Sequence, residues 1–160
     1  MRTAGPISVL AATLALAGCG GPDIDLGAGR GLSSPAGDFD GAAATVCREV
    51  AQRFDEIQAD PPRTFAQAGV VLGALLDAAR GGEEQLRALD PPAGRAAAFA
   101  RYLAARGDVI EQLERAREAA AAEQGGAYER ARDAALESAT LRFKLATRAG
   151  LNGCAKVERG

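Results

Sequence analysis

Three cysteines, Cys19, Cys47 and Cys154, have the most evident chemistry in this sequence. A thiol can be acylated, can form a disulfide, or can act as a nucleophile or redox centre when its surroundings lower its pKa. Catalytic redox pairs usually have the spacing Cys-x-x-Cys, whereas Cys47 and Cys154 stand 107 positions apart. The spacing therefore disfavours redox catalysis and leaves acylation, disulfide formation and free thiols as the hypotheses.

Most other side chains on which enzymes and metal sites depend are missing. The sequence contains no histidine, which removes the commonest general base and the His-ligated zinc, haem and di-iron sites. Met1 is the only methionine, and after position 18 the only serines, Ser33, Ser34 and Ser138, stand outside any Gly-x-Ser-x-Gly motif. We therefore expect a protein that is not an enzyme and that holds no cofactor or metal.

Regularly spaced acidic residues are the remaining candidates for chemistry. Three glutamates fall at helical spacing with arginines among them, so a cation site is one interpretation and a solvated face of ion pairs is the favoured one. A second acidic pair beside two glycines is expected to be exposed. The residues are Glu111, Glu114 and Glu118 with Arg115 and Arg117, and Glu83–Glu84 beside Gly81–Gly82.

The first 19 residues have the pattern of an export signal. Arg2 gives a positive start, and residues 6–16 form an apolar run far shorter than the roughly 20 residues of a spanning helix. The run ends in Leu16-Ala17-Gly18-Cys19, which resembles the lipobox of bacterial lipoproteins. The resemblance implies cleavage after Gly18, diacylglycerol on the Cys19 sulfur and acylation, for example by palmitate, of the new amino terminus. An ordinary secretory signal near an unrelated cysteine is the alternative.

Residues 19–40 and 41–156 differ in pattern. Residues 20–40 contain six glycines, two prolines and two serines without apolar periodicity, which predicts a lipidated, flexible and disordered tether over 19–40. From Gly41 on, apolar residues recur at steps of three and four, which indicates helices. No strand pattern is present. We expect a helical domain over 41–156 that follows a signal peptide over 1–18.

Local signals divide this domain into four helices. Asp40 is expected to cap the first, and Asp60-Pro61-Pro62 ends it. Thr64-Phe65-Ala66-Gln67 fits a capping box for the second helix, Gly81–Gly82 marks a kink or break within it, and Asp90-Pro91-Pro92 ends it. The third helix is predicted over 93–123 and the fourth over 127–149, with Gly125–Gly126 as the turn between them and Gly150-Leu151 as the final stop.

These helices have apolar faces that predict the core, and many of the inward positions are alanine. The expected inward residues are Val46 or Cys47, Val50, Phe54 and Ile57; Phe65, Ala68, Leu72, Leu75, Ala79, Leu86 and Leu89; Phe99, Leu103, Val109, Ile110, Leu113 and Ala120; and Tyr128, Ala131, Ala135, Leu136, Ala139, Phe143 and Ala146.

Short connections favour an all-α, up-down four-helix bundle. Such a bundle places the start of its first helix and the end of its fourth at the same end, so Cys47 and Cys154 can meet. Export permits disulfides, and lipidation of Cys19 leaves these two cysteines. The sequence therefore predicts a Cys47–Cys154 disulfide.

Residues 44–156 also resemble small exported helical proteins of GC-rich bacteria such as actinobacteria. The shared features are a cysteine in the first helix, Pro-Pro breaks between helices, and the closing Gly150-Leu151-Asn152-Gly153-Cys154. This resemblance supports the fold and the disulfide, and no activity comes with it.

Charge and composition narrow the range of partners. The chain has a net charge of −2 with both signs interleaved, and no basic stripe is present that could neutralise phosphates. Nucleic acid is therefore not expected as a partner. Membrane lipid is the expected partner, through the Cys19 anchor.

We expect an envelope lipoprotein on the outer face of the cell membrane, or on an outer membrane if the organism has one. The leading hypothesis for its function is a non-enzymatic module that interacts with an envelope protein. The alternative is a carrier or sensor of a small apolar ligand held between helices.

Overall fold

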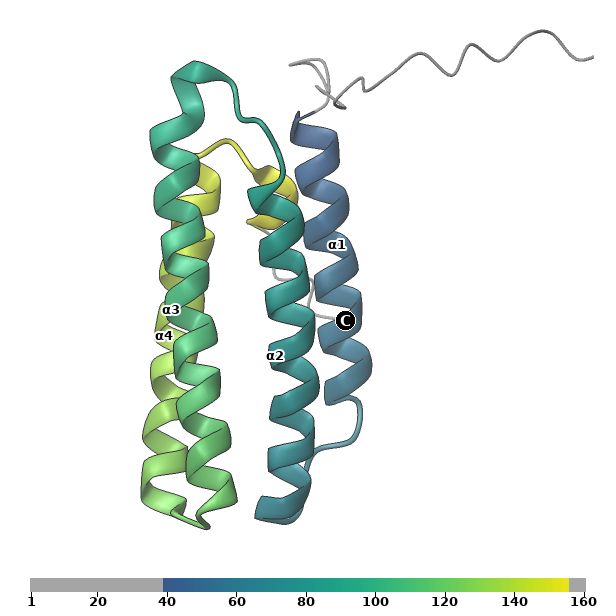
Figure 1. The fold of residues 1–160 in the computed structure, drawn as a ribbon, viewed down its shortest axis with the longest axis vertical. Coiled ribbons are helices and arrows are strands. Elements are labelled where there is room, and N and C mark those ends of the chain that lie inside the picture. Colours follow the sequence, from purple (N-terminus) through teal and green to yellow (C-terminus); the bar gives the residue numbers. More distant parts are fainter. Residues whose placement is uncertain (1–38, 156–160) are drawn as a thin grey trace, which may run out of the picture. The chain divides into compact units, whose positions relative to one another are not determined.

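A computed structural model describes residues 39–155, which form an all-α, up-down four-helix bundle, as the sequence predicts (Figure 1). This part of the chain contains no strand. Its elements are α1 (Phe39–Gln58), α2 (Phe65–Arg87), the short 3₁₀ helix η1 (Ala93–Arg95), α3 (Ala96–Ala121), α4 (Gly125–Arg148) and the 3₁₀ helix η2 (Asn152–Cys154).

Neighbouring helices in the chain are neighbours in space. α1 packs on α2, α2 on α3, and α3 on α4, whereas no Cα atom of α1 lies within 8 Å of a Cα atom of α4. Of the elements that the structure describes, only η2 crosses between them, because it follows α4 and packs against α1. The bundle is therefore bridged between α1 and α4 at one end and is open between these two helices along the rest of their length.

α2 begins at the predicted capping box and runs without a break. The Gln67 N–H donates to the Thr64 hydroxyl over 3.2 Å, while the Gln67 side chain accepts from the Arg63 N–H over 2.8 Å, one residue before the expected partner. The alternative of a break at Gly81–Gly82 is therefore wrong, because α2 continues through both glycines to Arg87. A Cβ atom on Gly82 would lie 2.3 Å from a methyl carbon of Val50, so this glycine permits the close packing of α1 on α2.

Two helix ends have the same hydrogen-bond pattern with different residues. After α4, the Leu151 N–H donates to the Ala146 carbonyl over 2.9 Å, with Gly150 at φ +73° and Leu151 buried, as predicted. After α3, the corresponding bond joins Gln124 and Ala119 over 2.9 Å, and the left-handed residue is Glu123 at φ 54°. The prediction of a Gly125–Gly126 turn is wrong because both glycines lie in the first turn of α4.

Two other boundaries also differ from expectation. α1 begins at Phe39 rather than Gly41, so Asp40 lies in the first helical turn, where its carboxylate contacts Arg95. The segment predicted as one helix over 93–123 divides into η1 and α3.

Most of the buried apolar side chains belong to one of two clusters. The cluster that we call the disulfide end consists of Phe39, Ala43, Val46, Cys47, Leu86, Phe99, Tyr102, Ala146, Ala149, Leu151 and Cys154. The cluster that we call the alanine end consists of Ala68, Leu72, Leu75, Ala116, Ala120 and Ala131. Most predicted inward residues are buried or half-buried, but Leu136 is 63% exposed. Leu76 and Tyr102 are almost fully buried, and the sequence did not indicate them.

Candidate ligand-binding groove

The Cys47–Cys154 disulfide is present and closes the bundle at the disulfide end. The two Sγ atoms are bonded at 2.05 Å, and both cysteines are buried. Cys47 lies in α1 and Cys154 in η2, so the bond fixes the bridge between α1 and the end of α4. Residues 1–38, with the predicted signal peptide, Cys19 and most of the predicted tether, lie outside the described residues.

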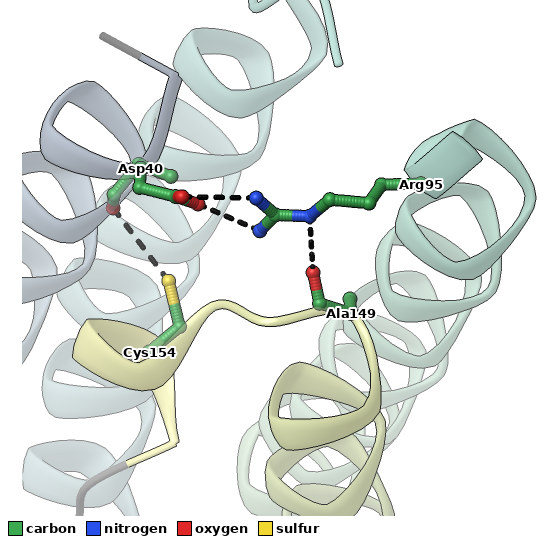
Figure 2. A network of polar contacts seen from close by, with 5 residues as sticks. Asp40, Arg95, Ala149 and Cys154 are labelled. Carbon is green, nitrogen blue, oxygen red and sulfur yellow. Dashed lines mark hydrogen bonds and ion pairs between the residues drawn. The ribbon is translucent and has the colours of Figure 1, made fainter. Parts of the chain in front are cut away.

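An arginine strengthens the same end of the bundle. Arg95 in η1 donates two hydrogen bonds to the Asp40 carboxylate of α1, of 2.9 and 2.6 Å, and one of 2.9 Å to the Ala149 carbonyl, close to Cys154 (Figure 2). Its guanidinium also lies 5.1 Å from the centre of the Phe39 ring. The hydrogen bonds and positive charge of Arg95 hold the pKa of Asp40 below its usual value. Three segments distant in the sequence therefore meet at one side chain.

The open side of the bundle contains a groove. Its main chamber has a volume of about 360 Å³, and all four helices contribute to its walls. The lining is mainly apolar, and its polar groups belong to Gln58, Arg132, Arg142 and the hydroxyl of Tyr128. The lining residues are Phe54, Gln58, Pro61, Pro62, Ala68, Val71, Leu72, Leu75, Val109, Leu113, Ala116, Tyr128, Arg132, Ala135, Leu136, Ala139 and Arg142. Small alanine side chains on α3 and α4 leave this space unfilled.

A smaller chamber of about 140 Å³ continues the groove toward the disulfide end. Phe54 and Arg142 line both chambers, so the two are adjacent. The smaller chamber is bordered by Tyr102, Arg106 and the disulfide itself. The groove is thus mainly apolar in its main chamber, and Arg106 and Arg142 line the smaller chamber, which we call the inner chamber.

Arg106 is a buried cation without a carboxylate partner in the described part of the chain. Only 4% of its surface is exposed, and it makes no ion pair with an acidic side chain among residues 39–155. Its Nη2 donates to the Ala79 carbonyl over 3.3 Å and its Nη1 to the Tyr102 hydroxyl over 3.4 Å, while its buried Nε has no partner in the described chain. A buried charge lowers the stability of the fold unless it is neutralised. Within the described residues, this cost of burying Arg106 is not offset by an ion pair.

Arg142 of α4 presents a second such cation. It makes no ion pair within residues 39–155, its Nε is buried without a partner there, and its guanidinium lies 4.6 Å from the centre of the Phe143 ring. Burial, and next the positive charge of Arg106, lower the pKa of Arg142, while Tyr102 acts in the opposite direction. The two positive charges therefore repel each other inside a partly desolvated site.

The sequence did not single out Arg106 or Arg142, although a signal was present. Each stands within the apolar face of its helix: Arg106 between Phe99 and Val109, and Arg142 between Ala139 and Ala146. A charged residue on an inward stripe either has a buried partner or faces a cavity.

The acidic residues that the sequence singled out do not gather in the groove. Glu111 pairs with Arg115, and Glu114 pairs with Arg80 of α2, as expected of a face of ion pairs. Glu83 is only 9% exposed and accepts a 3.0 Å hydrogen bond from Arg87, so its expected exposure is wrong. Within residues 39–155 no cluster of three or more His, Cys, Asp or Glu side chains could hold a metal ion.

Comparisons of the chain with protein-family models, with curated protein sequences and with solved structures gave no match. No helix within residues 39–155 is long and apolar enough to cross a membrane.

Proposed function

We propose that this chain is an exported, lipid-anchored binding protein that holds a small apolar molecule in the groove between α1 and α4. The observation that carries this proposal is the main chamber of about 360 Å³ with its largely apolar lining. Small-molecule sites are typically concave, mostly apolar spaces of roughly 300–1,000 Å³ with a few polar groups. We propose no catalytic role.

The groove reverses the order of the two hypotheses drawn from the sequence. A continuous exposed apolar patch on the surface would favour the interaction module. Among residues 39–155 the large exposed apolar side chains are Val70, Leu136 and Leu141, and Leu136 lines the groove. Scattered exposed apolar residues are ordinary, so they favour no particular protein partner, and the interaction module becomes the second proposal.

Filling the groove tests the proposed function. The full exported chain carrying Cys19→Ser is used, so that the acyl chains of the anchor do not compete for the site. We expect the neutral fluorescent probe N-phenyl-1-naphthylamine to bind this protein with enhanced fluorescence, and Ala139→Trp to weaken binding at least tenfold, because Ala139 lines the main chamber. Ala104→Trp places the same ring at an exposed position of α3 and should have no effect. Absence of probe binding, or equal loss in both variants, would overturn the proposal.

The anchor is a separate proposal that rests on the lipobox resemblance. Two or three acyl chains attach a protein firmly to a bilayer, whereas a single chain binds only marginally. We expect Cys19→Ser to remove the lipid and to release the protein into the soluble exported fraction, or to leave it as uncut precursor. Membrane fractionation and intact-protein mass spectrometry measure both outcomes. A correctly cleaved variant that stayed on the membrane would contradict the anchor.

A further inference from the structure

We infer that the inner chamber is an anion site, in which Arg106 and Arg142 bind the carboxylate head of a single-chain amphiphile whose apolar tail occupies the main chamber. The inference rests on the proposed function, because it names the chemical class of the molecule in the groove. It follows from the position of the two arginines along the groove and from the absence of an acidic partner for either among residues 39–155.

Charge is the first argument. Arg106 and Arg142 bring two positive charges to one small chamber, and no acidic side chain of residues 39–155 lines either chamber. Arg106 is 4% exposed, so water reaches it poorly. An anion would reduce the repulsion between the arginines and would restore the interactions that burial removes.

Hydrogen bonding is the second argument. A guanidinium has five N–H donors, and Arg106 directs one bond each to Ala79 and Tyr102 while its Nε stays without a partner in the described chain. The Arg142 Nε is buried and likewise unpartnered there. A carboxylate has two oxygens that accept several hydrogen bonds, and arginine binds this group in a bidentate manner. Because both arginines line the smaller chamber, a carboxylate held there would lie against both side chains.

The shape of the groove gives the orientation of the ligand. Arg142 and Phe54 stand where the two chambers meet, and Arg106 lines only the smaller one. The head is therefore directed toward the disulfide end. The tail lies along Leu72, Leu75 and Leu113 at the alanine end. The chamber of about 140 Å³ suits a compact head rather than a large polar one.

Two probes with the same chain length and different head groups test whether the site recognises a negative charge. With the full exported Cys19→Ser chain, calorimetric titration should show dodecanoate binding about ten- to a hundredfold more tightly than dodecanol, the range expected of charge-assisted hydrogen bonds. Arg106→Met and Arg142→Met should each remove most of this preference for dodecanoate over dodecanol. Arg148→Met, at an exposed position near the end of α4 and outside the groove, is the matched control. Acetate should compete poorly, because it has no tail.

The outcomes separate the two proposals. If dodecanoate and dodecanol bind equally well, or if the arginine variants keep the preference, the anion site is wrong while the apolar groove stands. If neither probe binds, the proposed function fails as well. If acetate displaces dodecanoate at equal concentration, the site serves a free small anion and the amphiphile is wrong. Thermal unfolding of each variant shows that the fold is intact, since exchanging an uncompensated buried charge for methionine should not lower stability.

Discussion

The two ends of the bundle use the same four helices and differ in what lies between α1 and α4. At the disulfide end, η2 occupies this space, a disulfide binds it to α1, and Phe39 and Phe99 pack edge to face with ring centres 5.1 Å apart. At the alanine end no element of residues 39–155 bridges the two helices, and small side chains leave a chamber. A bundle of this size can therefore hold an open groove in one half because the other half is covalently and densely fixed.

Removal of the disulfide should have the largest effect. The bond closes a loop of 107 residues, and its loss should lower the free energy of unfolding by about 4–5 kcal/mol on the chain-entropy argument. Urea unfolding of the wild type against Cys47→Ala/Cys154→Ala measures this. Hydrogen exchange should accelerate most in η2 and the adjoining part of α1. A uniform acceleration over both ends would show that they are not distinct.

A pair of leucines compares core packing at the two ends. Leu86 is fully buried at the disulfide end, so Leu86→Ala should cost about 3–4 kcal/mol. Leu72 lines the groove at the alanine end. Leu72→Ala should therefore cost about 2 kcal/mol, because it enlarges an existing open space rather than creating a sealed cavity. Chemical unfolding measures both, and equal costs would contradict the difference between the ends.

The two left-handed helix ends provide a third comparison. Glu123→Gly should stabilise the protein by about 1 kcal/mol, because glycine adopts positive φ without the strain of a Cβ atom. Gly150→Ala should destabilise it, since φ is +73° there and the new Cβ would lie 2.9 Å from the Arg95 guanidinium. Thermal unfolding gives the sign of each change. A neutral or destabilising Glu123→Gly would indicate that the Glu123 side chain makes a compensating contact.

The ion pair of Asp40 with Arg95 should have the smallest effect. Asp40 is 63% exposed, so Asp40→Asn should cost less than about 1 kcal/mol near neutral pH. Because the pKa of Asp40 is lowered by folding, its contribution is present above its usual value of 3.8 and disappears as pH falls through the lowered value. The stability difference between wild type and variant, measured from pH 6 to pH 2, should therefore shrink toward zero. Asp77→Asn, at an exposed position of α2, is the control.

The features that sequence predicted well are those that depend on local chemistry. Thr64 and Gln67 cap α2, and Gly150 with Leu151 ends α4, because a few neighbouring residues determine each geometry. The disulfide followed from bundle topology and the number of cysteines. Apolar periodicity located the four helices, although it misplaced Leu136, which borders the groove instead of filling it.

The features that sequence did not predict depend on how distant helices meet. Nothing near Arg106 in the chain shows that Arg142 lies beside the same chamber, because the two residues belong to different helices. The turn at Glu123 was missed because two glycines nearby gave a stronger local signal for it. The groove itself results from the separation of α1 and α4, which follows from the summed volume of side chains rather than from any motif.

Gly81 and Gly82 are adjacent and chemically identical, but they should differ in the substitutions that they can accept. Gly81 has open space where a side chain would project, whereas at Gly82 even a methyl group would collide with Val50 and approach the Arg106 guanidinium to 3.2 Å. In a scan of all single substitutions, Gly81 should therefore accept many residue types and Gly82 almost none. A selection for ligand binding should separate the two positions further, since Gly82 packs directly against one wall of the inner chamber.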